Sequence, residues 1–442
     1  MDGTGMESLL AEPREVAWRI QPGDVVITSC GATLPYAFLD ALGERGDLHG
    51  VTIYSALTLE PTRWMVRQYR GVREEQKRSP GLRFLSFGLG PADREAWAHG
   101  LTDLVPVGSR YIRDLFLRSG HSFNVIAVGS SGMDEDGNFN VGPGVDWTLD
   151  LLSAAEEGDA LVVVEVNPRL PFTHGETSFR RELVDHVIVA DRPPPELLPG
   201  REHPEDRLIA RHVADLVPDE ATLAVGHGGL VDRVVRGLSR KRNLGVFSDL
   251  IGDALLHLHQ EGALTNRRKG FMDGRWVGTH VMGTRALYEF VHHNPAIHLA
   301  PVEFVTEGAN LLRHERLVAI SGAAEIDLYG QVAGDASGFR QLSGPGAQAI
   351  FHQAASRSRD GAGIVVLRST RAGGRTSTIS TSLRPGSTVS IPRSDVDCII
   401  TENGVARLRG CSMRERALAL ISVAHPDHQD RLAREASEQG LL

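Results

Sequence analysis

Short apolar runs recur along the chain, and longer stretches with helical periodicity separate them. In the first half of the sequence these runs lie at residues 25–27, 51–54, 125–128, 161–164 and 187–189. Glycine or proline flanks most of them, as is typical of strand ends. Buried strands that alternate with helices predict an α/β fold with a mainly parallel sheet.

A proline-rich segment interrupts this pattern near the middle of the chain. Residues 192–204 contain five prolines in an otherwise polar context, which predicts an extended linker. A helical stretch at 208–217 follows, and apolar runs then return at 223–225, 244–247, 317–320, 364–367 and 398–401. A chain of 442 residues is long enough for two cores. The sequence therefore predicts two open-sheet α/β domains, residues 1–200 and 201–442.

Composition narrows the class of protein. Hydrophobic residues make up 41% of the chain and charged residues 23%, as in soluble globular proteins. The formal net charge of -9 argues against a nucleic-acid-binding protein with a basic surface. The N-terminus lacks the pattern of a signal peptide, and no apolar run reaches the length of a membrane span. We therefore expect a cytoplasmic protein that contacts neither nucleic acid nor membrane.

Cysteine and histidine usage gives no indication of a metal centre. The three cysteines, at positions 30, 398 and 411, are too few for a disulfide framework or a cysteine-rich metal site. The paired histidines lack an accompanying set of carboxylates. The sequence predicts no metal. Glu307, Glu325 and Glu402 are reserve carboxylates for catalysis, although each also fits a structural role.

The most informative segment is residues 225–230, where an apolar run turns through Gly226, Gly228 and Gly229 into an amphipathic helix. Such a strand end exposes backbone N–H groups that could hold a developing oxyanion. The next apolar run leads to Asp249, a carboxylate that could act as a nucleophile. From these residues alone, a tight turn without a ligand and a helix cap at Asp249 are alternative interpretations. A dinucleotide-binding turn is disfavoured, because Val231 stands where a third small residue is required.

This pair of segments resembles the acetyl-CoA hydrolase/transferase family, especially its butyrate and 4-hydroxybutyrate CoA-transferases. Further stretches similar to motifs of the family lie at residues 134–142, 164–171, 265–269, 282–284, 326–332, 343–348, 401–406, 408–410 and 414–417. The resemblance thus extends over almost the whole chain. It implies two similar open-sheet domains of the CoA-transferase type with the active site between them, and an assembly that is a homodimer or larger.

The resemblance also implies roles for particular residues. Gly228 and Gly229 would supply the oxyanion donors, and Asp249 matches the nucleophilic glutamate of the family. The substrates would be an acyl-CoA, which brings coenzyme A, and a small carboxylic acid. The residues expected to contact CoA or substrate are Gly226, Gly344, Gly346, Gln348, Phe351, Gly373, Gly374 and Arg375. The last three could cradle phosphates through backbone donors and a guanidinium, or form a surface turn.

Three departures from the family pattern occur, and the first two keep alternatives open. Aspartate replaces the nucleophilic glutamate at Asp249, and Ile350 replaces an aspartate of the CoA loop. The basic residue beside Gly373 and Gly374 is also displaced. The shorter side chain is on the order of 1 Å out of place, a misplacement that can cost about a hundredfold in rate. The leading hypothesis is a CoA-transferase. The alternatives are an acyl-CoA hydrolase that uses Asp249 as nucleophile or general base, and a CoA-ester binding protein or an enzyme with altered acyl-transfer chemistry.

Overall fold

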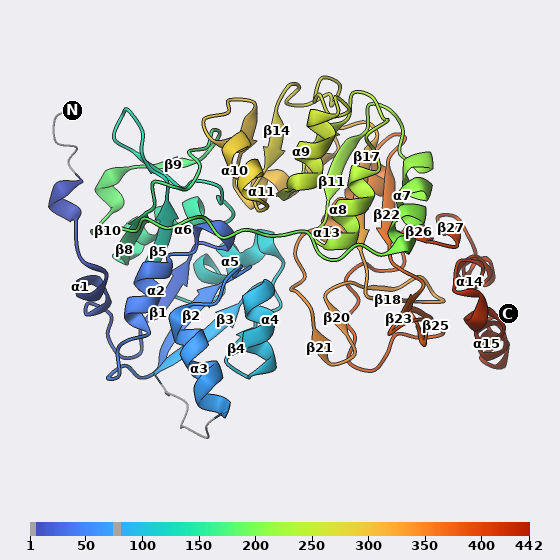
Figure 1. The fold of residues 1–442 in the computed structure, drawn as a ribbon, viewed down its shortest axis with the longest axis horizontal. Helices are drawn as coiled ribbons and strands as arrows, with labels where there is room; N and C mark the ends of the chain where they lie inside the picture. Colours follow the sequence, from blue (N-terminus) through green and yellow to red (C-terminus); the bar gives the residue numbers. More distant parts are fainter. Residues whose placement is uncertain (1–5, 74–80) are drawn as a thin grey trace. The chain divides into compact units, whose positions relative to one another are not determined.

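The computed structural model describes residues 6–73 and 81–442. Its contacts divide the chain into two compact units (Figure 1). Unit 1 comprises Met1–Leu197 and Thr279–Glu303, and unit 2 comprises Leu198–Gly278 and Phe304–Leu442. Thr279–Glu303 is thus the part of the second half whose contacts lie with unit 1. The division into domains 1–200 and 201–442 stays a prediction.

Unit 1 is built on a seven-stranded sheet in which all neighbouring strands are parallel. The strand order is β10-β8-β5-β1-β2-β3-β4. The bounds are β1 (Val25–Thr28), β2 (Val51–Ser55), β3 (Leu82–Ser86), β4 (Thr102–Leu104), β5 (Val125–Ser130), β8 (Leu161–Val166) and β10 (His186–Val189). The five apolar runs of the first half all form strands. Strands β3 and β4 contain polar residues, so the hydrophobic pattern did not predict them.

Both faces of this sheet are covered, which explains why its strands are almost continuously apolar. Helices α1 (Pro13–Ala17), α2 (Tyr36–Leu42) and the start of α3 (Arg63–Arg73) share one hydrophobic core with the strands. An aromatic cluster around the Tyr54 side chain forms a second layer, in which Tyr54 meets Phe116 edge-on with ring centroids 5.2 Å apart. The pattern thus predicts β1, β2, β5, β8 and β10 because few of their residues are exposed to water.

Unit 2 is built on a six-stranded sheet with the order β12-β11-β17-β22-β26-β27. Only the edge strand β27 is antiparallel to its neighbour. The bounds are β11 (Thr222–Val225), β12 (Gly245–Val246), β17 (Leu317–Gly322), β22 (Ala362–Val366), β26 (Cys398–Thr401) and β27 (Gly404–Arg407). The predicted fold class, α/β with open and mainly parallel sheets, is confirmed.

Several helices cover the sheet of unit 2 and position the segments discussed below. Helix α7 packs on α8, α8 packs on α9, and α13 lies against β17 and β22. The bounds are α7 (Pro204–Leu216), α8 (Gly229–Arg236), α9 (Asp253–Gln260), α13 (Gln348–Arg357), α14 (Met413–Ser422) and α15 (Pro426–Glu438). Residues 190–203, which contain most of the predicted linker, form neither helix nor strand before α7 begins. In the described part of the chain, no helix is both long and apolar enough to cross a membrane.

His352 on α13 is a polar side chain sealed in the core of unit 2. It is fully buried, and neither ring nitrogen has a hydrogen-bond partner among the described residues. Gly363 on β22 makes room for the ring, because a Cβ there would lie 2.7 Å from Nδ1. Burial lowers the pKa of His352 to about 4. The ring is therefore neutral in the folded protein at neutral pH.

We expect His352 to make the fold sensitive to acid. Its folded pKa of about 4 lies below the unfolded value of about 6.5, so the unfolded chain binds a proton that the folded chain excludes. The stability it contributes is present above pH 6.5 and is lost as the pH falls toward 4, by at most about 1.4 kcal/mol per pH unit. Chemical unfolding of wild type and His352→Leu between pH 7 and pH 5 measures this. Identical pH dependence in the two proteins would contradict it.

Candidate active site

The glycine turn and Asp249 follow neighbouring strands of the unit 2 sheet. Strands β11 and β12 are parallel, so their carboxyl ends lie at the same edge, where ligands of open α/β sheets bind. Ser248 bridges these ends: its Oγ accepts a hydrogen bond from Val225 N at 2.9 Å and lies 3.1 Å from Val225 O. The residue before Asp249 therefore contacts the residue before Gly226. Tertiary structure brings the two predicted groups together.

The turn after β11 leaves backbone donors without acceptors. Gly226 still belongs to the sheet, since its N–H donates to Ile320 O at 2.8 Å. Gly228 has φ +129° and ψ 148° and caps α8, whose first N–H groups have no partner within the helix. Among the described residues, none accepts a hydrogen bond from the N–H of Gly228 or Gly229. This arrangement can hold an anion or a developing oxyanion.

Gly228 is required for its conformation and not for lack of space. A Cβ at this position would meet no atom within 4 Å, but φ +129° is a conformation that residues with side chains rarely adopt. A substitution would therefore move the backbone of the turn. At Gly229 a Cβ would approach a side chain, because Arg233 Nη2 would lie 3.4 Å away.

The Asp249 carboxylate is anchored through one of its two oxygens. Its Oδ1 accepts a hydrogen bond from Leu250 N at 2.9 Å and lies 3.4 Å from Ser248 Oγ. No group in the described part of unit 2 donates to Oδ2, and the residue is half-buried. One oxygen thus orients the carboxylate, and the other is available to attack an electrophile or to accept a proton.

Side chains satisfy the backbone groups of Val246 at the outer edge of β12. Val246 N donates to Asn266 Oδ1 at 2.8 Å, and Lys269 Nζ donates to Val246 O at 3.1 Å and to Arg275 O at 2.6 Å. Gly245 leaves space for this lysine, because a Cβ there would lie 2.3 Å from Lys269 Cγ. Burial lowers the pKa of Lys269 to about 7. Asn266 and Lys269 therefore fix the strand that carries Asp249, a role that the sequence did not reveal.

A buried ion cluster supports the turn from the other side. Asp206 at the start of α7 is buried and pairs with Arg233 Nε at 2.5 Å and with Arg368 Nε at 2.7 Å. Arg233 Nη1 also donates to Gly200 O at 2.9 Å. The cluster therefore holds a guanidinium beside Gly229. Its members lie far apart in the sequence, so no motif could have indicated them.

The predicted CoA loop lies near the same sheet edge. Gly344 is buried, Gly346 is exposed with φ +55°, and α13 begins at Gln348. The Gln348 side chain lies beside Gly334, whose Cβ would be 3.1 Å from the amide group and 3.3 Å from Gly322 O. Gly322 ends β17, the neighbour of β11. Gln348 therefore lies close to the carboxyl end of β17, the strand next to β11. Phe351 is buried in the core, and Ile350 beside it is half-buried.

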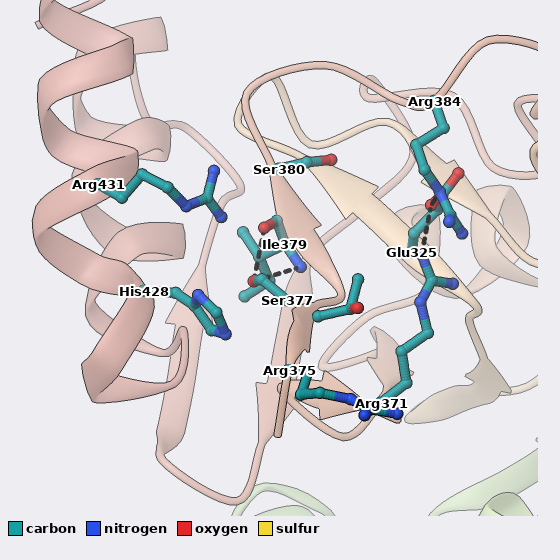
Figure 2. Close-up of a pocket in the computed structure, with 10 residues that line it drawn as sticks. Glu325, Arg371, Arg375, Ser377, Ile379, Ser380, Arg384, His428 and Arg431 are labelled. Carbon is teal, nitrogen blue, oxygen red and sulfur yellow. Dashed lines mark hydrogen bonds and ion pairs between the residues drawn. The ribbon is translucent and has the colours of Figure 1, made fainter. Parts of the chain in front are cut away.

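The predicted phosphate-binding residues form the turn of a hairpin that follows β22. This hairpin consists of β23 (Thr370–Arg371) and β24 (Thr376–Ser377), and its turn contains Gly373 at φ +68° and Gly374 at φ +88°. Arg375 is exposed and lines a cavity between the hairpin and α15 (Figure 2). The groups expected from the sequence thus follow or approach the carboxyl ends of β11, β12, β17 and β22.

The reserve carboxylates have structural partners. Glu307 accepts a hydrogen bond from Ala309 N at the start of a short helix, α12 (Gly308–Leu311). Glu325 pairs with Arg384 at 2.8 Å, and Glu402 accepts Ser369 N at 3.0 Å. No group of three or more histidine, cysteine, aspartate or glutamate residues that could hold a metal occurs in residues 6–73 and 81–442. Asp249 is therefore the leading carboxylate.

Ser248 offers a direct test of the bridge between β11 and β12. Ser248→Ala leaves the buried Val225 N–H without an acceptor, so we expect a loss of about 1–3 kcal/mol in the free energy of unfolding. Turnover should fall as well, because Asp249 loses one of its two anchors. Ser248→Thr keeps the hydroxyl and is the matched control. Denaturant unfolding and steady-state kinetics measure both effects. Equal stability of wild type and Ser248→Ala would contradict the bridge.

Comparison with known proteins identifies the family of the chain. Residues 283–436 match the acetyl-CoA hydrolase/transferase C-terminal domain. A succinyl-CoA:cyclohexane-1-carboxylate CoA transferase from Geobacter metallireducens is 33% identical over 98% of this chain and 96% of its own. A 4-hydroxybutyrate coenzyme A transferase from Clostridium kluyveri is 32% identical over 90% of this chain and 92% of its own.

Solved structures show that the similarity to known proteins includes the fold. The crystal structure of RipA from Yersinia pestis matches with a TM-score of 0.89 and 28% identity, and the match covers 99% of each chain. Similarity in sequence and in structure therefore spans both units and is not limited to the C-terminal domain. The chain belongs to the acetyl-CoA hydrolase/transferase family.

Proposed function

We propose that the protein is an acyl-CoA:carboxylate CoA-transferase that moves CoA between short acyl groups through Asp249. The observation that carries this proposal is the junction of β11 and β12. There a carboxylate with one unengaged oxygen follows one strand, and the acceptor-free N–H groups of Gly228 and Gly229 follow the other. A nucleophile and an oxyanion site are the two parts that acyl transfer requires.

In this reaction Asp249 Oδ2 attacks the thioester carbonyl of an acyl-CoA. The carbonyl oxygen becomes an oxyanion that accepts hydrogen bonds from Gly228 and Gly229, and its collapse expels CoA thiolate and leaves a mixed anhydride on Asp249. The thiolate then attacks the aspartyl carbonyl, which releases the first carboxylate and forms an Asp249–CoA thioester. A second carboxylate attacks this thioester, and the same two steps in reverse yield the new acyl-CoA.

The proposed CoA contacts carry over from the family resemblance. They comprise Gly226 at the turn, Gly344, Gly346, Gln348 and Phe351 at the loop before and within α13, and Gly373, Gly374 and Arg375 at the β23–β24 hairpin. All of them belong to unit 2. Because Phe351 is buried, its contribution would be to shape the loop. We further propose a cytoplasmic homodimer or larger homo-oligomer, since CoA thioesters are intracellular metabolites and the family resemblance implies such assemblies.

An acyl-CoA panel tests the proposed function. The panel contains acetyl-, butyryl- and succinyl-CoA, each with and without acetate, butyrate, 4-hydroxybutyrate or cyclohexane-1-carboxylate. The first two acids represent the short acyl groups of the proposal, and the last two are named in the Clostridium and Geobacter relatives. Mass spectrometry records whether a new acyl-CoA forms, whether free CoA accumulates, or whether neither occurs. A new acyl-CoA that requires the added acid is the expected result. Turnover to free CoA alone would identify a hydrolase, and no turnover with any pair would contradict both.

The second candidate function is acyl-CoA hydrolysis, and the anchoring of Asp249 favours it. Aspartate is one methylene shorter than the glutamate of the family pattern, and its Oδ1 lies 2.9 Å from Leu250 N. When the aspartyl carbonyl is activated as a CoA thioester, that nitrogen can lose its proton and attack the carbonyl carbon, which closes a five-membered succinimide and expels CoA as the thiol. Water must then open the ring before Asp249 can react again. Glutamate cannot form this ring. Water activated by Asp249 as a general base avoids the covalent intermediate and therefore this side reaction.

A further inference from the structure

Unit 2 contains a cavity of about 280 Å³, and half of the residues that line it are basic (Figure 2). It lies between α15 and a small sheet made of β18 (Glu325–Asp327), β19 (Val332–Ala333) and β25 (Ile379–Ser380). The charged and titratable residues of its lining are Glu325, Arg371, Arg375, Arg384, His428 and Arg431. Four guanidinium groups and a histidine thus surround one carboxylate.

The single carboxylate, Glu325, does not neutralise the positive charge of the four arginines. Glu325 is buried and accepts Arg384 Nε at 2.8 Å, with Arg371 Nη2 at 3.5 Å and a short hydrogen bond from Ser387 Oγ. These hydrogen bonds and charges outweigh burial and lower the pKa of Glu325. Burial and the nearby Arg384 charge lower the pKa of Arg371. The carboxylate is therefore ionised, yet the two guanidiniums closest to it still repel each other.

The remaining cations have little compensation inside the cavity. Arg375 Nε donates to Ala372 O at 3.0 Å, a neutral acceptor. Arg431 pairs at 2.8 Å with Glu435, which does not line the cavity, and His428 Nε2 donates to Gly374 O at 3.1 Å. All three side chains line the same cavity. Figure 2 shows His428 and Arg431 extending from α15 and Arg375 extending toward Arg371. An excess of positive charge in a concave site is satisfied by a bound anion.

The donors indicate which anion fits. Guanidinium groups present paired N–H donors that match phosphate oxygens, and several of them can share one dianion. A carboxylate carries one charge and would leave most of these donors unused. We propose that this cavity is a phosphate-binding site, occupied by the 3′-phosphate of CoA or by free phosphate. Occupation by CoA rests on the proposed function, whereas binding of free phosphate is independent of it.

Calorimetric titration of the full chain with inorganic phosphate tests the site itself. The variants are Arg375→Gln and Arg431→Gln, and Arg434→Gln is the matched control because Arg434 is exposed on the same helix and does not line the cavity. We expect phosphate to bind wild type and Arg434→Gln with equal affinity. Each lining variant should bind about tenfold more weakly or worse, since a charge-assisted hydrogen bond is lost. No binding to wild type, or equal binding by all four proteins, would overturn the proposal.

A second titration distinguishes the two sources of the phosphate group. CoA is compared with 3′-dephospho-CoA, which lacks only the monoester phosphate. If the CoA 3′-phosphate occupies the cavity, wild type should prefer CoA by about tenfold or more, and Arg431→Gln should lose most of this preference. If Arg431→Gln binds inorganic phosphate more weakly than wild type but keeps the same preference for CoA over 3′-dephospho-CoA, the site binds free phosphate. Thermal unfolding of each variant shows whether it is folded, and neither titration requires transferase activity.

Discussion

Replacing Gly228 with valine should reduce turnover by a factor of roughly 10²–10³, the usual effect of losing an oxyanion donor, while unit 2 stays folded. The structure provides space for the new side chain, since no atom lies within 4 Å of the added Cβ. The effect arises from φ +129°, which valine does not tolerate. The backbone must rotate, and the N–H groups of Gly228 and Gly229 then no longer point to one place.

Gly262 provides the matched control for this experiment. It is a glycine of unit 2 with φ +76° after α9, and a Cβ there also meets no atom within 4 Å. Gly262→Val should therefore show a similar conformational cost in thermal unfolding but keep its turnover. Steady-state kinetics on both variants distinguish the effect of backbone strain from the effect of losing the oxyanion donors. Near-normal turnover in Gly228→Val would rule out the oxyanion assignment.

Asp249→Ala should remove both transfer and hydrolysis, with a loss on the order of 10⁴-fold or more, as for other essential catalytic groups. The physical reason is that the described part of unit 2 offers Asp249 as the carboxylate at the β11–β12 junction. Asp249→Glu restores the length found in the family pattern. It should shift the ratio of transfer to hydrolysis toward transfer, because the longer side chain reaches the acyl carbon and cannot close a succinimide with the next amide.

Mass spectrometry of the protein distinguishes the two roles of Asp249. A nucleophilic role requires a CoA thioester on Asp249 that borohydride reduces, whereas a general-base role leaves no adduct. Loss of one water from the Asp249 peptide during turnover would report succinimide formation. Glu261→Ala, which removes an exposed acid after α9, is the control and should behave as wild type. Full activity of either kind in Asp249→Ala would refute the carboxylate-centred mechanism.

Much of the fold was predictable because parallel strands buried on both faces leave a strong local signal. Strands β1, β5 and β8 of unit 1 and β17 and β22 of unit 2 coincide with continuous apolar runs. Strand β4 has the sequence Thr-Asp-Leu at a sheet edge and lacks this signal, because an edge strand need not be apolar throughout. Strand β3 lies between β2 and β4, but the exposed Arg83 interrupts its apolar run.

The candidate site was predictable where the chemistry is local. The need for glycine at position 228 follows from a turn between a strand and a helix, and the structure shows the positive φ that makes glycine necessary. The proximity of this turn to Asp249 was expected from the order of two adjacent strands. It depends on their pairing, which the Ser248 bridge to Val225 fixes.

The sequence by itself determined the fold class, the family and the two segments that carry the proposed chemistry, because each depends on residues close together along the chain. Only the tertiary structure decided which distant side chains hold these segments in place. Lys269 satisfies the edge of β12, Arg368 and Arg233 share Asp206 beside the glycine turn, and the cavity beside α15 collects its four arginines. These contacts leave no periodic pattern in the sequence, because only long-range packing brings their partners within hydrogen-bonding distance.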